Sequence, residues 1–195
     1  MKKYILLFLL VSCSSSRLSI GTIFLESTII YDKVKLSYSD NFNKVILRGK
    51  VTISKDSLIK FKFFGPLGVE AVSGKFVTIL ELQSQFTDSL SEKISSKLYD
   101  TFGFQLERKM VENLLLFNSL KLYEQLVVTC PSTISVGLSH SGFNKSVITL
   151  VDHNRKSSSM ITFVTKERFP LEIYMEYVRD DYFLKLKMDV YSLQK

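Results

Sequence analysis

Short runs in which apolar and polar residues alternate fill most of this chain and constrain its fold most strongly. A strand places successive side chains on opposite faces, so this alternation is typical of half-buried β-strands. The runs are Val34–Tyr38, Val45–Ser54, Ile59–Phe63, Val69–Ser73, Phe76–Leu82, Tyr123–Cys130, Thr133–Leu138, Ser146–Val151, Met160–Thr165, Leu171–Tyr177 and Phe183–Tyr191. Polar turn residues such as Lys55-Asp56-Ser57 join them. We therefore expect a mainly β protein with one curved antiparallel sheet of about ten strands.

The apolar period changes from two to four residues in the middle of the chain. A first helical stripe contains Leu90, Ile94, Leu98 and Phe102, and Gly103 follows it. A second helix is expected from about Leu106 to Phe117. The sequence thus predicts a helical hairpin inserted between two groups of strands. Its wide apolar stripe needs an apolar surface to face.

The first twelve residues are typical of a lipoprotein signal peptide. Lys2 and Lys3 precede the apolar run 4–11, which is far shorter than the ~20 residues that a membrane-spanning helix needs. The segment Leu10-Val11-Ser12-Cys13 matches a lipobox, in which the cysteine thiol receives diacylglycerol and cleavage occurs before the cysteine. We expect a signal peptide at 1–12, a lipidated tether at 13–20 and one domain at 21–195. An ordinary signal peptide with a chance cysteine is the alternative.

The charge and the cysteine content limit the partners. The formal net charge of +7 is spread along the chain without a dense basic block. Because an export signal also makes nucleic acid an unsuitable partner, we expect no nucleic-acid binding, but weak attraction to anionic lipid headgroups is compatible with this charge. Cys130 would be the only thiol besides Cys13, so no intramolecular disulfide is expected, and we expect Cys130 to be buried. We expect a monomer.

The residues of an enzyme or metal site are sparse. His140 and His153 are the only histidines, and neither lies in a metal-ligand spacing or beside a GxSxG motif. The pair Asp180-Asp181 is typical of a solvated turn. We therefore expect no enzymatic activity, no metal and no cofactor.

Three blocks of the sequence resemble the LolB-like outer-membrane lipoprotein receptors, within the wider LolA/LolB-like lipoprotein family. They are Ile59–Glu70, with a strand and a Pro-Leu-Gly loop, Lys97–Phe117, with a glycine break and a Leu-rich helix, and Leu184–Asp189 near the end. The resemblance implies an incomplete antiparallel β-barrel, capped by helices around an apolar cavity for acyl chains. It also implies an outer-membrane protein facing the periplasm, which receives lipoproteins from a soluble LolA-like carrier and inserts them into the membrane. The absence of Trp departs from such sheets.

The resemblance assigns roles to a few residues. Leu67, between Pro66 and Gly68, matches the leucine that protrudes from the family's Pro-Leu-Gly loop toward membrane lipids, although it could also fold back onto the sheet. The expected cavity lining is Phe61, Phe63, Leu114, Phe117 and Met188. A second hypothesis keeps the fold but fills the core, and makes the chain a structural envelope lipoprotein that binds a protein partner through an exposed apolar patch.

Overall fold

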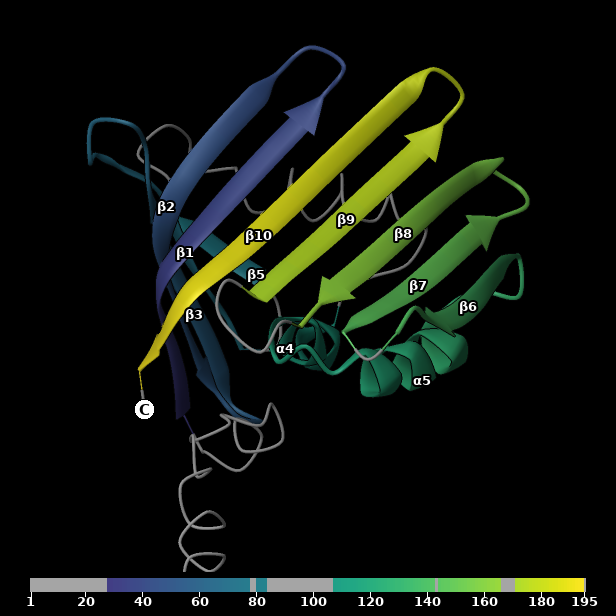
Figure 1. Cartoon of the computed structure of the whole chain (residues 1–195), viewed down its shortest axis with the longest axis horizontal. Coiled ribbons are helices and arrows are strands. Elements are labelled where there is room, and N and C mark those ends of the chain that lie inside the picture. Colours follow the sequence, from purple (N-terminus) through teal and green to yellow (C-terminus); the bar gives the residue numbers. More distant parts are fainter. Residues whose placement is uncertain (1–27, 78–79, 84–106, 143, 166–170, 195) are drawn as a thin grey trace, which may run out of the picture.

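A ten-stranded antiparallel sheet dominates the computed structural model, which describes residues 28–77, 80–83, 107–142, 144–165 and 171–194 (Figure 1). The strand order is β5-β4-β3-β2-β1-β10-β9-β8-β7-β6, so the first and last strands pair at the centre. The edge strands β5 and β6 do not pair with each other, so the curved sheet stays unclosed. This confirms the expected mainly β, antiparallel architecture.

The strands agree closely with the alternating runs of the sequence. They are β1 (Thr28–Asp40), β2 (Lys44–Ser54), β3 (Leu58–Phe64), β4 (Glu70–Phe76), β5 (Leu80–Gln83), β6 (Ile134–His140), β7 (Lys145–Asp152), β8 (Ser157–Val164), β9 (Leu171–Arg179) and β10 (Tyr182–Gln194). Ten of the eleven expected runs therefore contain strands. The sequence underestimated the lengths of β1 and β10, which pair with each other along most of their length.

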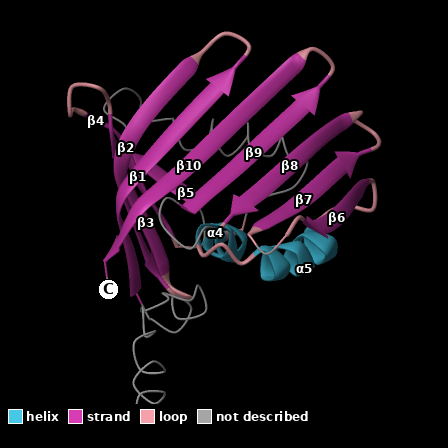
Figure 2. Cartoon of the chain, viewed as in Figure 1, coloured by secondary structure: helices cyan, strands magenta, loops and turns pink. Residues whose placement is uncertain are grey.

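The one remaining run, Tyr123–Cys130, is helical, so the strand expected there is wrong. Helix α4 (Arg108–Leu115) confirms the second predicted helix, and α5 (Ser119–Thr129) follows it almost at once (Figure 2). In α5, Leu122 and Leu126 are buried one turn apart, and the Asn118 side chain accepts a hydrogen bond from the Lys121 N–H. The helical spacing of these two leucines outweighs the strand preference of the β-branched residues at the end of α5. The first predicted helix, 90–102, and Gly103 lie outside the described residues.

The strand register brings apolar side chains together on one face of the sheet, which we call the inner face. One row crosses six strands through Val72, Phe63, Gly49, Val34, Val190 and Leu171. A second row contains Leu47, Leu36, Met188, Ile173 and Phe163. Because a one-residue slip would turn every such side chain outward, this pattern fixes the register. Residues of α4 and α5 pack against the same face.

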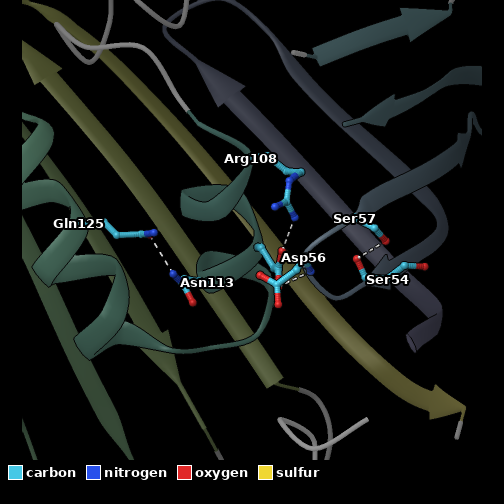
Figure 3. A network of polar contacts seen from close by, with 7 residues as sticks. Ser54, Asp56, Ser57, Arg108, Asn113 and Gln125 are labelled. Carbon is cyan, nitrogen blue, oxygen red and sulfur yellow. Dashed lines mark hydrogen bonds and ion pairs between the residues drawn. The ribbon is translucent and has the colours of Figure 1, made fainter. Parts of the chain in front are cut away.

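Buried polar contacts attach α4 to the inner face. The Tyr31 hydroxyl donates to the Leu115 carbonyl over 2.8 Å, at a helix end where carbonyls lack helical partners. The buried carboxylate of Glu112 accepts from Arg108 over 2.7 Å and from the Asp56 N–H in the β2–β3 turn (Figure 3).

A further hydrogen bond joins the two helices to each other. The Asn113 side chain donates to Gln125 over 2.8 Å and so connects α4 with α5 (Figure 3).

Among the described residues, no helix is long and apolar enough to cross a membrane.

Candidate lipid-facing and membrane-facing surfaces

The five residues expected to line a cavity all lie on the inner face. Phe63, Phe117 and Met188 are buried in the core cluster. Phe61 and Leu114 are only partly buried and pack against that cluster. The rings of Phe61 and Phe63 lie 6.1 Å apart on neighbouring inward positions of β3. The structure thus gathers these side chains on one side of the sheet, although they come from β3, β10 and the helical segment.

Phe117 reaches the inner face through an unusual backbone conformation. It follows the last turn of α4 with φ at 56°, a left-handed conformation that is costly for an aromatic residue. The Asn118 N–H donates to the Asn113 carbonyl, and the Phe117 N–H to Leu114, which closes the helix end. The buried ring packs edge-on against Phe163 with 6.4 Å between centroids. Packing in the core therefore offsets backbone strain at this corner.

The β3–β4 turn presents Leu67 to solvent. The Gly65 N–H donates to the Val69 carbonyl over 2.9 Å, and the Gly68 N–H to Gly65 over 3.1 Å. Gly68 has φ at 73°, which a residue with a side chain rarely adopts. Leu67 is 91 % exposed at the tip of this closed turn, and Pro66 and Gly68 are exposed beside it. The side chain therefore points away from the sheet, as the loop sequence indicated.

A second exposed apolar tip, Phe42 in the β1–β2 turn, was not recognised from the sequence. Phe42 is 87 % exposed, and its N–H donates to Asp40 Oδ1 over 2.8 Å. The neighbouring Asn41 donates to the Asp181 carbonyl and accepts from the Phe183 N–H, so it joins this turn to the β9–β10 turn. The only sequence feature that could have indicated this exposed tip is a phenylalanine that lies among Asp and Asn residues in a turn.

Phe42 and Leu67 occupy the same end of the sheet. Neighbouring antiparallel strands reverse at alternate ends, so the β1–β2 and β3–β4 turns share one end and the β2–β3 turn lies at the other (Figure 1). We call this the tip end. Further exposed apolar side chains near it are Val45, Val69 and Phe183.

The two histidines each contact one serine. His153 Nε2 lies 2.8 Å from Ser135 Oγ, and His140 Nδ1 lies 3.0 Å from Ser146 Oγ, both at the surface. The Asp152 carboxylate accepts instead from the N–H groups of Asn154 and Arg155. In the described part of the chain, no group of three His, Cys, Asp or Glu side chains could hold a metal ion.

Two further expectations concern cysteine. Cys130 is partly buried at the end of α5, and burial raises the pKa of its thiol to about 11. Such a thiol stays protonated and reacts slowly. Cys13 and the signal peptide lie outside the described residues.

No protein-family model matches the sequence, and no curated protein matches it.

Proposed function

We propose that this chain is a membrane-anchored lipoprotein that binds acyl chains against the inner face of its sheet. On this proposal it is lipidated at Cys13, faces the periplasm from the outer membrane and inserts lipoproteins or other lipids there, as the LolB-like resemblance implies. The observation that carries the proposal is Leu67, a leucine that a hydrogen-bonded turn holds 91 % exposed. A soluble carrier would supply the lipid, and no energy source is required if the acyl chains move toward higher affinity.

The energetics favour two contacts with the bilayer. Moving one exposed Leu or Phe side chain into lipid contributes ~1.5–3 kcal/mol. Leu67 and Phe42 together would therefore give weak, reversible binding, which suits a contact that forms and breaks during delivery. Lasting attachment needs the acyl chains on Cys13, because one chain alone binds only marginally.

The inner face supplies an apolar surface for the cargo. Several apolar side chains there remain partly accessible while packing against the core, among them Phe61, Leu114 and Met175. The sheet is curved and unclosed, so its two edges are not joined by strand pairing. Such a surface is chemically suited to acyl chains, which need no polar partners.

Membrane insertion of Leu67 can be measured directly because the chain contains no tryptophan. In the full chain anchored in vesicles, Leu67→Trp should give blue-shifted fluorescence that brominated lipids quench. Val128→Trp is the matched control, since Val128 is 86 % exposed on α5, away from the tip turns. Equal quenching of both tryptophans, or of neither, would contradict the proposed orientation.

A second experiment should show that lipopeptide delivery can be impaired while lipopeptide binding is unchanged. Leu67→Glu should slow transfer of a fluorescent lipopeptide from the protein to acceptor vesicles, while binding of the lipopeptide stays unchanged. Val128→Glu adds the same charge elsewhere and should affect neither step. If Leu67→Glu lost binding and delivery equally, the loop would be structural. Failure of the unaltered chain to bind the lipopeptide would remove the acyl-binding function itself.

A scaffolding function is the second candidate, and one observation favours it. The outer side of α5 exposes Leu120, Val127 and Val128. Exposed apolar residues that gather on one helix are typical of a contact with another protein. On this alternative, Val128→Glu would abolish capture of an envelope partner, whereas Leu67→Glu would leave that capture intact.

A further inference from the structure

Strand β6 is an edge of the sheet, and within the part of the chain that the structure describes it pairs only with β7 (Figure 1). A free edge presents N–H and C=O groups that can accept a further strand. Proteins usually block such an edge with lysine, proline or a bulge. β6 has none of these devices, because Ile134–His140 contains neither lysine nor proline and its register with β7 is continuous.

The bonds at the two ends of β6 show which of its backbone groups face outward. The Thr133 carbonyl accepts from the His153 N–H just before the strand, and the Ser141 N–H donates to the Lys145 carbonyl just after it. Hydrogen-bonded pairs occur at every second residue of an antiparallel ladder. The odd-numbered residues of β6 therefore bond toward β7, and the even-numbered residues direct their N–H and C=O groups away from the sheet.

Val136 and Leu138 thus offer two N–H and two C=O groups at the free edge. No hydrogen bond from the described residues reaches these four groups. Ile134 offers only its carbonyl, because its N–H already donates to the Pro131 carbonyl over 2.9 Å. The part of the edge that can receive a strand is therefore centred on Gly137.

This edge is complementary to a second copy of itself. A two-fold axis through Gly137, perpendicular to the sheet, would place Val136 opposite Leu138 of the second copy and Leu138 opposite Val136 of the second copy. Each of these pairs can exchange two N–H···O bonds, which gives four hydrogen bonds across the axis. The contact is closed, since the same residues contribute from both sides.

The side chains match across the same axis. On the inner face, Val136 would meet Leu138, and both already pack against the core cluster. On the outer face, Ser135 would meet Ser139 and Gly137 would meet its own copy, and all three residues are exposed. Nothing lies within 4 Å of a Cβ position at Gly137, so the approach is open and a small side chain fits there. The pairing opposes no like charges.

Helix α5 adds an apolar surface to this edge. It contacts both β6 and β7, and a two-fold axis perpendicular to the sheet keeps both copies of α5 on the inner face (Figure 1). Because strands lie roughly 4.8 Å apart, two helices that each lie between β6 and β7 would be about 10 Å apart, close to the spacing of packed helices. Leu120 and Val127, two turns apart on one stripe of α5, are about half exposed and available to this contact.

We propose that the free edge of β6 is the interface through which two copies of this chain pair, with their sheets continuous across the axis at Gly137. The pairing differs from the monomer expected from the sequence, and it does not depend on the proposed function. It has one consequence that does. Antiparallel pairing reverses one copy, so the two tip ends lie at opposite ends of the pair, and only one Leu67 can meet a given membrane.

Cysteine cross-linking of the full chain in detergent micelles tests the register. Cys130 is first replaced by Ser, and this parent chain is the control. Gly137→Cys should form a disulfide-linked dimer on oxidation, because facing residues of a non-hydrogen-bonded pair have Cα atoms about 4.5 Å apart. Ser135→Cys should stay monomeric, since its two copies would be roughly 13 Å apart. A mixture of Ser135→Cys and Ser139→Cys should cross-link.

The cross-linking pattern decides between pairing and collision. Equal cross-linking of Gly137→Cys and Ser135→Cys would mean random encounters and would overturn the interface. Cross-linking of Ser135→Cys without Gly137→Cys would overturn the axis at Gly137. Absence of any disulfide-linked dimer would overturn the pairing altogether.

A charge exchange tests the same contact without a covalent bond. Gly137→Lys and Gly137→Glu each oppose like charges at the axis and should lose the dimer in analytical ultracentrifugation, whereas an equal mixture of the two should restore it. Ser158 is exposed on β8, on the same outer face but away from the edge, so Ser158→Lys and Ser158→Glu should remain dimeric. A mixture of the Gly137 variants that stays monomeric would contradict the proposal.

Tryptophan quenching tests the consequence for the membrane. The Gly137→Cys chain that also carries Leu67→Trp is anchored in brominated vesicles at low surface density, where reduced copies separate. The oxidised dimer should show about half the quenching of the reduced chain, because one of its two tip ends points away from the bilayer. Equal quenching in both forms would overturn the opposed tip ends. Quenching in neither form would instead contradict the proposed membrane contact of Leu67 and leave the cross-linking result standing.

Discussion

At the scale of single residues, Asp40 shows how one carboxylate holds a tip turn. It accepts hydrogen bonds from the Tyr38 hydroxyl over 2.6 Å and from the N–H groups of Phe42 and Asn43. These bonds, with the one from Tyr38 the largest cause, lower the pKa of Asp40 to about 2. A pKa lowered in the folded state means that the carboxylate stabilises the turn above its unfolded pKa, near 3.9. That contribution disappears as the pH falls through about 2.

Because the pKa of Asp40 is lowered in the folded state, the β1–β2 turn should change only at low pH. The amide resonances of Phe42 and Asn43 should shift with a midpoint near pH 2, well below the ordinary Asp value. NMR spectra recorded between pH 5 and pH 1.5 measure this midpoint. In Asp40→Asn the same resonances should not titrate. A midpoint close to 4 would mean that the hydrogen bonds do not form in solution.

Tyr31 joins β1 to helix α4 through its hydroxyl. The side chain is fully buried, and burial raises the pKa of its hydroxyl, which therefore remains a donor. Tyr31→Phe leaves the Leu115 carbonyl without this bond and should lower the free energy of unfolding by about 1–2 kcal/mol. Tyr191→Phe, at an exposed position on β10, should change it by less than ~0.5 kcal/mol. Equal effects in denaturant unfolding would contradict the buried hydrogen bond.

At the scale of elements, the sequence predicted the strands well because their alternation is local and regular. The strand assigned to Tyr123–Cys130 failed because Val127, Val128 and Thr129 favour strands, whereas the decisive spacing of Leu122 and Leu126 is helical. The Leu67 turn could be predicted because Pro and Gly mark it. The hydrogen bond from Asn113 to Gln125 could not be predicted, since it depends on helix α5, which the sequence had suggested as a strand.

Gly49 determines how β2 and β3 approach each other. A Cβ atom at this position would lie 2.0 Å from the Lys62 carbonyl and 2.7 Å from the Phe63 ring. Gly49→Ala should therefore force the strands apart and lower the free energy of unfolding by about 2–3 kcal/mol. Gly137→Ala is the matched control, because nothing lies within 4 Å of its Cβ position. Denaturant unfolding of both variants tests this, and equal stabilities would refute the close approach.

At the scale of the whole molecule, the inward-facing residues could be predicted as apolar but not as neighbours. Phe63, Leu114 and Met188 are far apart in the sequence, and only the pairing of β1 with β10 brings the two halves of the sheet together. Phe42 was missed for the same reason. Its proximity to the β9–β10 turn arises from the Asn41 contacts between segments about 140 residues apart.

The direction of β1 has a consequence for how far the protein reaches. Thr28 begins the strand at the end opposite the tip turns, and the strand of 13 residues is about 40 Å long. The fifteen residue steps from Cys13 to Thr28 can extend over at most roughly 50 Å. On the proposed anchoring, Leu67 therefore meets the membrane that holds the lipid only if the whole segment 13–27, and not just the expected tether 13–20, can extend.

Deleting residues 16–22 should therefore abolish bromolipid quenching of Leu67→Trp, and seven Gly or Ser residues in their place should restore it. Quenching that survives the deletion would mean that the tip end approaches the bilayer without this linker length. If the prediction holds, the contour length of this segment decides whether the tip end can reach the membrane that holds the lipid. A longer linker would then make that contact easier, and a shorter one would hold the tip end away from that membrane.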